Sequence, residues 1–299
     1  MLRSNRSSCS ASVLPGGCPC GEPASRRGRH RACTRSHGET LSMATLGFIG
    51  SGNLGAKIAR LATAAGIDVV LSNSRGPESL AQTVAELGER ARAATPTEAA
   101  EAGDWVVISV PLAAHRQFPA AALAGKTVLD TINYYPSWRD GYIDVLDSGK
   151  ITTTELVQEH LADANLVKSF STISDQHILT LARPAGSHER SAVPIAGNSL
   201  RAKASAVELI GRLGYDTVDV GPLTESWRFE PETLASAVPY FADPDAYKAA
   251  VAKVAEALRA GRSPMDENFE DLGAPLPADR LRILLDETPR VLTADRVMP

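Results

Sequence analysis

The stretch GFIGSGNLG at residues 47–55 carries three glycines, Gly50, Gly52 and Gly55, in the spacing G-x-G-x-x-G. An apolar run precedes it, and the amphipathic pattern NLGAKIARLATAAG at 53–66 follows directly. In dinucleotide-binding folds the first glycine permits a tight turn, the second lets the backbone approach a pyrophosphate, and the third lets the helix pack closely on the sheet. The glycine pattern alone is a weak signal, but this context favours a bound nucleotide at the helix start over a purely structural turn.

The rest of the chain alternates short apolar runs with helical patterns. We expect strands at 45–50, 67–72, 91–94, 104–111, 126–131, 164–171, 191–197 and 215–221. We expect helices at 53–66, 77–88, 95–103, 152–161, 173–182, 199–214, 243–261 and 278–287, with Thr95 and Glu98 forming a capping box. Because parallel strands need crossover helices, the pattern predicts an α/β fold. It is a Rossmann-type, doubly wound, mostly parallel sheet with a small C-terminal α/β extension.

The second strand ends in polar residues where such folds usually carry an acid. In DVVLSNSRG (68–76) the strand runs into Ser72, Asn73, Ser74 and Arg75. A carboxylate would hold the ribose hydroxyls of NAD and repel a 2′-phosphate, whereas these residues supply neutral donors and a planar cation that can bind phosphate. The sequence therefore predicts NADP(H) as the cofactor. The alternative is a solvated arginine in a polar turn.

Charge and cysteine are unevenly distributed along the chain. The first 42 residues hold all four cysteines, seven of the 31 basic residues and two of the 35 acidic ones, which leaves a net charge of −9 over 43–299. Such an acidic body predicts no nucleic-acid partner, and its lack of cysteine fits a cytoplasmic location. The longest apolar stretch, at 105–114, is too short to span a membrane. We expect residues 1–42 to be a disordered extension, and Met43 is favoured as the natural start.

Several stretches together resemble one family. GFIGSGNLG, VVLSNSRGPESL (69–80), VVISVPL (106–112), VLDTINYYPSWRDG (128–141) and LVKSFSTI (166–173) are similar to the NADPH-dependent F420 reductases, or F420-dependent NADP oxidoreductases, of the actinobacterial type. The resemblance spans residues 45 to 231, and its N-terminal Rossmann unit is shared with pyrroline-5-carboxylate reductases. At 168–171 the chain reads K-S-F-S where the family usually reads K-A-F-N, so Ser171 replaces an asparagine near the acceptor.

The resemblance implies a role for particular residues. It implies that Ser51, Asn53 and Leu54 lie along the pyrophosphate, that Ser74 and Arg75 hold the 2′-phosphate, and that Val110, Pro111 and Leu112 line the path from adenine to nicotinamide. It places Asn133 and the segment Phe170, Ser171, Thr172 and Ile173 in the wall of the nicotinamide pocket. Hydride transfer between two rings needs positioning and no protein nucleophile, so we predict no catalytic acid–base pair.

Other residues are weaker candidates. His177 or His188 could donate to an acceptor carbonyl, although a lone histidine is more often structural. Tyr134, Tyr135 and Trp138 could stack on a flat ring or form a small hydrophobic cluster, and Arg139, Lys168 and Arg183 could meet an acidic tail of the acceptor. The four histidines of the body are scattered without metal-ligand spacing, so we predict no metal site.

We therefore expect an NADP-dependent oxidoreductase that transfers hydride between NADPH and coenzyme F420, or a related acceptor, and that acts on a small molecule as a homodimer. The alternatives are a pyrroline-5-carboxylate or imine reductase and a non-catalytic NADPH-binding sensor. The first of these normally carries a longer helical C-terminal domain. The expected domains are the extension 1–42, an NADP-binding Rossmann core at 43–132, its continuation on the acceptor side at 133–231, and a C-terminal helical extension at 232–299.

Overall fold

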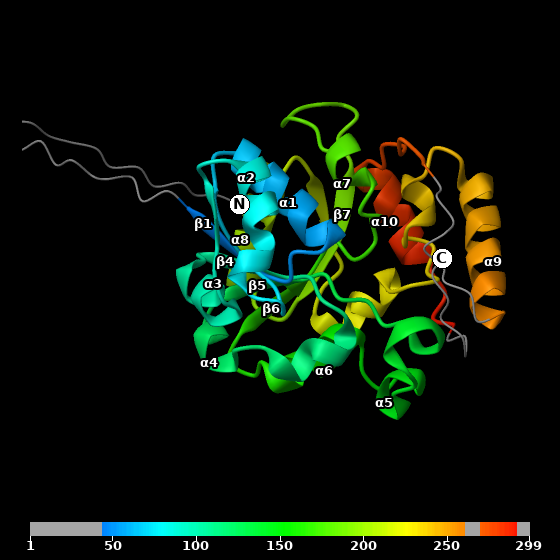
Figure 1. Cartoon of the computed structure of the whole chain (residues 1–299). Coiled ribbons are helices and arrows are strands. Elements are labelled where there is room, and N and C mark those ends of the chain that lie inside the picture. Colours follow the sequence, from blue (N-terminus) through cyan, green and yellow to red (C-terminus); the bar gives the residue numbers. More distant parts are fainter. Residues whose placement is uncertain (1–43, 261–269, 292–299) are drawn as a thin grey trace, which may run out of the picture. The chain divides into compact units, whose positions relative to one another are not determined.

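The computed structural model describes residues 44–260 and 270–291, apart from the side chains of residues 138, 254, 255 and 257–259. The expected disordered extension at 1–42 lies outside the described residues. No helix in the described ranges has the length and apolar character that a membrane span requires. Figure 1 shows the fold of the chain from residue 44 onward.

One sheet organises the described residues. Its strands are β1 (Thr45–Ile49), β2 (Asp68–Ser72), β3 (Ala91–Ala93), β4 (Trp105–Ile108), β5 (Thr127–Asp130), β6 (Asn165–Lys168), β7 (Ala192–Gly197) and β8 (Asp216–Asp219). They lie in the order β3-β2-β1-β4-β5-β6-β7-β8. The first six are parallel, β7 runs antiparallel to β6, and β8 is parallel to β7. The order 3-2-1-4-5-6 is that of the Rossmann fold, so the predicted fold class is confirmed.

The helices mostly occupy their expected places. They are α1 (Asn53–Ala64), α2 (Ala81–Leu87), α3 (Pro96–Ala102), α4 (Ala120–Leu123), α5 (Asp144–Asp147), α6 (Thr153–His160), α7 (His177–Thr180), α8 (Leu200–Arg212), α9 (Pro244–Arg259) and α10 (Ala278–Glu287). Shorter 3-10 or π turns are η1 (Pro77–Leu80), η2 (Leu112–Gln117), η3 (Pro136–Asp140), η4 (Leu223–Phe229) and η5 (Val238–Tyr240). The predicted capping box is present, because the Thr95 hydroxyl accepts from Glu98 N–H and the Glu98 carboxylate accepts from Thr95 N–H.

The helix predicted at 173–182 is wrong over most of its length. Only the single turn of α7 is helical, and the residues before it form turns. Lys57 on α1 holds Asp175 in this stretch through an ion pair of 2.6 Å, and Ile173 is already buried in the core. These contacts with distant parts of the chain hold the backbone in place of a longer helix.

Apolar side chains fill both faces of the sheet. Along β4, Trp105 and Val107 belong to a core shared with α1 and α8, whereas Val106 and Ile108 belong to a second core shared with α3, α4 and α6. Figure 1 shows α1 and α6 on opposite sides of the sheet. A strand that is buried on both faces needs apolar residues at nearly every position, and this is why the strands appear in the sequence as continuous apolar runs.

The strand register brings the ends of four strands to one edge. Ile49 is paired with Ile108, Ile108 with Asp130, and Asp130 with Lys168. The residues that follow β1, β4, β5 and β6 therefore emerge side by side at the carboxyl edge of the parallel sheet. Ligands of open α/β sheets bind at this edge, near the point where the strand order reverses between β1 and β4.

The C-terminal segment packs on the part of the sheet formed by β7 and β8. Helix α10 contacts β7 and β8, and Ala192 N–H at the start of β7 donates to Leu276 O (2.8 Å). The fully buried Tyr240 donates its hydroxyl to Ala192 O at 2.8 Å. Ala237 N–H donates to Thr172 O (2.8 Å). The C-terminal extension is thus held by hydrogen bonds to β7 and to the segment that follows β6.

Arg190 joins three parts of this second half. Its side chain is buried, and Nε donates to Asp216 Oδ1 at 2.7 Å. Nη1 donates to Arg183 O, while Nη2 donates to both Gly211 O and Tyr215 O at 2.7 Å. The planar guanidinium thereby donates to three carbonyls, in the loop after α7, at the end of α8 and just before β8, and to the carboxylate of Asp216 on β8.

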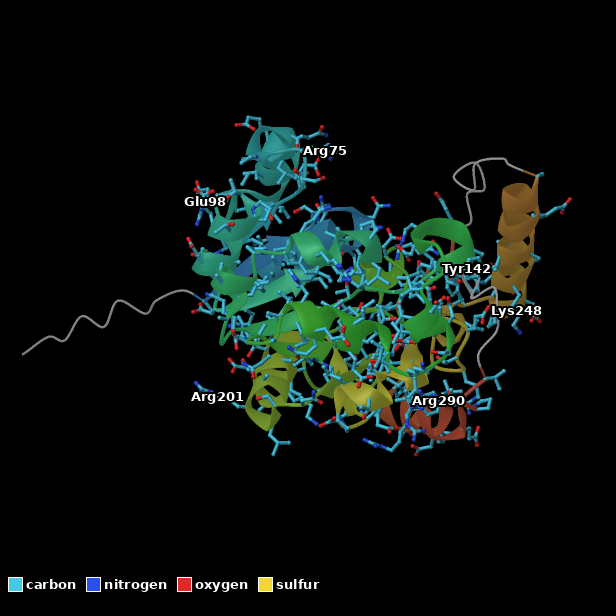
Figure 2. All side chains as sticks on the ribbon, turned by 90° about the horizontal axis from the view of Figure 1, so that it is seen from below. Arg75, Glu98, Tyr142, Arg201, Lys248 and Arg290 are labelled. Atoms are coloured by element: carbon cyan, nitrogen blue, oxygen red, sulfur yellow. The ribbon has the colours of Figure 1, made fainter. Side chains whose placement is uncertain are left out.

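We predict that Arg190→Lys lowers the free energy of unfolding by about 2–4 kcal/mol, because an ammonium group cannot reach all four acceptors. The measurement is urea unfolding followed by circular dichroism. Arg201→Lys is the matched control, since Arg201 is exposed on α8 (Figure 2) and the same exchange there should stay within about 0.5 kcal/mol. Equal effects of the two exchanges would contradict this role of Arg190.

Candidate dinucleotide-binding site

Two glycines of the turn after β1 are required by the protein itself. Gly50 has a φ of 96°, and a Cβ there would lie 2.2 Å from Ser109 O. A Cβ on Gly55 would lie 2.5 Å from Gly50 O. The turn, the start of α1 and the end of β4 are therefore packed backbone against backbone, as predicted for the first and third glycines of the pattern.

Gly52 is different, because nothing in the described structure demands a glycine at this position. It is exposed, its φ of −75° suits any residue, and a Cβ would meet no atom within 4 Å. It is also the N-cap of α1, where it offers no side chain to the free N–H groups, and the first turn carries no acidic residue. An open space at an uncapped helix N-terminus suits an anion such as a pyrophosphate.

The end of β2 fixes the position of the glycine turn. Ser72 O accepts from Gly50 N–H at 3.1 Å and from the Ser51 hydroxyl at 2.9 Å. The Ser72 side chain is fully buried and donates to Phe48 O at 2.6 Å. Its hydroxyl is thus engaged within the protein, and Ser72 joins the two turns that the sequence assigned to the cofactor.

The residues after Ser72 form a compact turn. Asn73 Oδ1 accepts from Arg75 N–H at 2.9 Å, which closes an Asx turn, and Asn73 Nδ2 donates to Ser79 Oγ at 2.9 Å. Ser74 is exposed, and so is Arg75, which Figure 2 labels. Within the described residues the Arg75 guanidinium has no hydrogen-bond or ion-pair partner, and no carboxylate lies between Ser72 and Arg75 in the sequence. The turn therefore presents a hydroxyl and an unneutralised planar cation.

The three residues of the loop after β4 that we expected near the cofactor differ in exposure. Pro111 is exposed and Val110 is half-buried, whereas Leu112 is fully buried in the core that covers α6. Val110 Cγ1 lies 2.5 Å from the position that a Cβ on Gly50 would take, so this loop borders the glycine turn.

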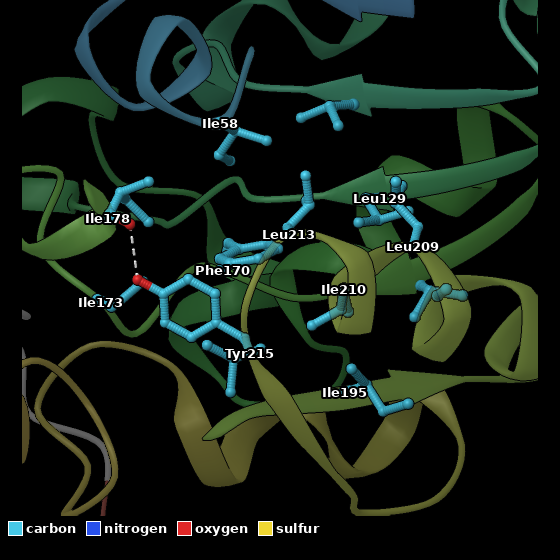
Figure 3. Packing of buried hydrophobic residues seen from close by; sticks show 14 of the residues in the cluster. Ile58, Leu129, Phe170, Ile173, Ile178, Ile195, Leu209, Ile210, Leu213 and Tyr215 are labelled. Carbon is cyan, nitrogen blue, oxygen red and sulfur yellow. Dashed lines mark hydrogen bonds between the residues drawn. The ribbon is translucent and has the colours of Figure 1, made fainter. Parts of the chain in front are cut away.

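The segment after β6 also turns two of its side chains into the core. Phe170 has a φ of 55°, and its ring packs edge to face on Tyr215 with the ring centres 5.5 Å apart (Figure 3). Ile173 belongs to the same core. A non-glycine residue with positive φ is uncommon and costs energy, so the surrounding packing holds this backbone in place.

Asn133 and Ser171 connect the ends of β5 and β6. Asn133 Nδ2 donates to Ser171 O at 2.6 Å and lies 3.3 Å from the Tyr135 hydroxyl. Thr172, the next residue, lies against the extension, with its hydroxyl 3.4 Å from that of Tyr240. The structure thus brings Asn133 and the segment 170–173 together at the carboxyl edge. Their place in the wall of a nicotinamide pocket stays a prediction.

Among the remaining aromatic and basic candidates, Tyr134 and Lys168 are structural, and the side chain of Trp138 lies outside the described residues. Tyr134 is fully buried, and its hydroxyl lies 2.8 Å from Asp147 Oδ1, so it belongs to the core. Lys168 is fully buried and donates to Ile132 O, so the expectation that it could meet an acidic tail of the acceptor is wrong. Tyr135 is half-buried, burial raises its pKa, and Arg139 lies over its ring at 5.1 Å.

The histidine candidates separate clearly. His188 is exposed, whereas His177 is fully buried, with Nε2 3.1 Å from Asp271 Oδ1 and its ring edge to face with Phe241. Burial lowers the pKa of His177, although Asp271 opposes this effect. His177 therefore holds α7 to the C-terminal extension. Among the described residues no group of three or more histidine, cysteine, aspartate or glutamate side chains is placed to hold a metal ion.

Sequence reasoning missed the ion pair between Lys57 and Asp175, whose charged atoms lie 2.6 Å apart. It joins the helix that begins at the glycine turn to the segment that follows β6. The sequence alone places Lys57 one turn into α1, as a cation near the expected pyrophosphate. Its partner Asp175 lies 118 residues further along the chain, and no local pattern indicates the pair.

Comparisons with known proteins agree with this geometry. The model of the family described as NADP oxidoreductase, coenzyme F420-dependent, matches residues 45–134. A hypothetical protein from Sinorhizobium meliloti is 30% identical, with alignment over 62% of this chain and 89% of that chain and a TM-score of 0.54. A candidate F420-dependent NADP reductase from Arthrobacter sp. FB24 shares the fold at 23% identity, over 62% of this chain and 87% of that chain, with a TM-score of 0.51. No curated protein matches the chain.

The sheet order, the glycine turn and the free arginine after β2 are what a Rossmann-type NADP site requires. The family model covers this same part of the chain, from β1 to the residues that follow β5. The chain therefore belongs to the family of coenzyme F420-dependent NADP oxidoreductases, and it is an NADP-dependent oxidoreductase.

Proposed function

We propose that the protein transfers a hydride between NADPH and a deazaflavin of the F420 type, or a closely related acceptor. Two observations carry the cofactor half: the open space at Gly52, and the Arg75 guanidinium, which has no partner among the described residues, on the turn that Ser72 O joins to the glycine turn. The acceptor half rests on the family, whose description names coenzyme F420. The partners of such a reaction are small molecules, and the acidic charge of residues 43–299 disfavours nucleic acid.

Each end of the cofactor has a proposed partner. The backbone around Ser51, Asn53 and Leu54 at the start of α1 would hold the pyrophosphate, helped by the partial positive charge of the helix N-terminus. Ser74 and Arg75 would hold the 2′-phosphate, because a hydroxyl and a planar guanidinium can both donate to its oxygens. No carboxylate stands at the end of β2 to repel that phosphate.

The acceptor side would be built mainly by backbone and by the polar residues at the strand ends. Val110 and Pro111 would border the path to the nicotinamide, while Leu112 supports that loop from the core. Asn133 and Ser171 would face the rings. Phe170 and Ile173 shape the segment from the core side, and Thr172 holds it to the extension through Tyr240. NADPH supplies the hydride from its nicotinamide when it is bound. The protein's task is to orient two rings and to exclude water.

The direct test is to mix the purified protein with NADP and reduced F420 and to follow deazaflavin oxidation together with NADPH formation. We expect turnover with NADP and much slower turnover when NAD replaces it. Tight NADPH binding without turnover would contradict the proposal and favour a non-catalytic sensor. Reduction of a cyclic imine such as pyrroline-5-carboxylate, in place of F420, would favour the imine-reductase alternative.

The Gly52→Ala variant tests the proposed pyrophosphate site. We predict unchanged or slightly raised stability, because the position has a φ that alanine accepts and no neighbour to clash with. Affinity for NADPH should fall at least about tenfold, since the methyl group would occupy the space proposed for the pyrophosphate. Fluorescence titration with NADPH measures the affinity, and thermal unfolding measures the stability.

The contrasting variant is Gly50→Ala, which should fail to fold or lose several kcal/mol because of the clash with Ser109 O and the positive φ. A Gly52→Ala protein that binds NADPH as tightly as the wild type would show that no ligand approaches the backbone at this position.

A further inference from the structure

Two buried polar atoms at the carboxyl edge have no partner within the described part of the chain. They are Asn133 Oδ1 and Ser171 Oγ, and the Ser171 residue is only 8% exposed. Buried polar side-chain atoms in folded proteins nearly always form a hydrogen bond, and leaving one unpaired is destabilising. Two such atoms on neighbouring strand ends therefore need an explanation.

The contacts of Asn133 decide which amide atom is left over. The atom nearest to Ser171 O lies 2.6 Å away, and because a carbonyl oxygen only accepts, that atom must be the nitrogen. The same nitrogen lies 3.3 Å from the Tyr135 hydroxyl. The orientation of the Asn133 amide is therefore fixed, and Asn133 Oδ1 is, among the described residues, a free acceptor that an N–H donor of a ligand can use. The Ser171 hydroxyl belongs to the same residue as the carbonyl that accepts from Asn133 Nδ2, and it can donate its own hydrogen.

The position of this pair is where the second half of a dinucleotide would lie. Asp130 and Lys168 pair in register with Ile108, which pairs with Ile49 just before the glycine turn. Asn133 and Ser171 each follow this row by three residues. Neighbouring strands are about 4.8 Å apart, so β5 lies roughly 10 Å from β1, well within the span of an extended dinucleotide.

We propose that Asn133 and Ser171 together recognise an amide edge, in which an N–H group stands beside a carbonyl. Asn133 Oδ1 accepts from the N–H, and the Ser171 hydroxyl donates to the carbonyl. This inference rests on the proposed function, which supplies two sources of that chemistry: the carboxamide of the nicotinamide and the pyrimidinedione edge of the deazaflavin.

The substitution that carries the test is Ser171→Ala. If Ser171 serves a ligand, removing its unpaired hydroxyl leaves the stability of the free protein unchanged or raises it, because no internal hydrogen bond is lost. At the same time the ligand that it recognises should bind about tenfold more weakly. A serine with a purely structural role would move stability and leave ligand affinity unchanged.

Ser226→Ala is the matched control. Ser226 on η4 is also fully buried, and its hydroxyl has no hydrogen-bond partner among the described residues, but it lies outside the proposed cofactor and acceptor positions. Its substitution should change stability in the same direction as Ser171→Ala and leave every ligand affinity at the wild-type value.

The source of the amide edge follows from separate titrations with NADPH and with oxidised F420. Weaker NADPH binding by Ser171→Ala assigns the pair to the nicotinamide, and weaker F420 binding assigns it to the acceptor. The acetylpyridine analogue of NADPH, in which a methyl group replaces the amide nitrogen, adds a second arm. It should bind the wild type about tenfold more weakly if Asn133 Oδ1 accepts from the carboxamide, and this penalty should vanish in Asn133→Ala.

Unchanged binding of both NADPH and F420 by Ser171→Ala would overturn the inference. Binding is measured without turnover, so the two failures remain distinct. A wild type that turns over F420 while Ser171→Ala binds both ligands normally would refute only the role of this pair. A wild type that neither binds nor turns over F420, with Ser171→Ala defective in NADPH binding, would refute only the proposed acceptor.

Discussion

The close backbone packing of the glycine turn is the constraint on which the cofactor site depends. Gly50 leaves no room for a side chain beside Ser109 O, and Gly55 leaves none beside Gly50 O. Ser72 O then holds the turn through Gly50 N–H and the Ser51 hydroxyl. Because β1, the start of α1 and the ends of β2 and β4 are joined in this way, the helix N-terminus and the turn that carries Arg75 have fixed positions.

The same edge of the sheet extends this arrangement to the acceptor side. The register aligns the ends of β1, β4, β5 and β6, and the ion pair between Lys57 and Asp175 ties α1 to the segment after β6. From the other side the extension holds that segment through Ala237 N–H and Tyr240. Hydride transfer asks a protein mainly for orientation, and a segment braced from both sides meets that requirement.

Sequence patterns predicted correctly those features of the fold that depend on residues close together in the chain. The capping box at Thr95 and α10 were both readable, because a cap and an amphipathic helix depend on residues three or four positions apart. Contacts across the chain were not readable. The sequence could not show that Phe48 O engages the Ser72 hydroxyl, that Lys168 is buried, or that β7 reverses direction, since each depends on which distant segments become neighbours. The short α7 has the same origin.

We propose that the turn after β2 selects NADP through its 2′-phosphate. It is tested most directly by titrating the wild type and Arg75→Ala with adenosine 2′,5′-bisphosphate and with 5′-AMP, which differ only in that phosphate. We expect the wild type to bind the bisphosphate at least about tenfold more tightly than 5′-AMP, salt to weaken this preference, and Arg75→Ala to remove most of it. Equal affinities of the wild type for the two nucleotides would contradict it.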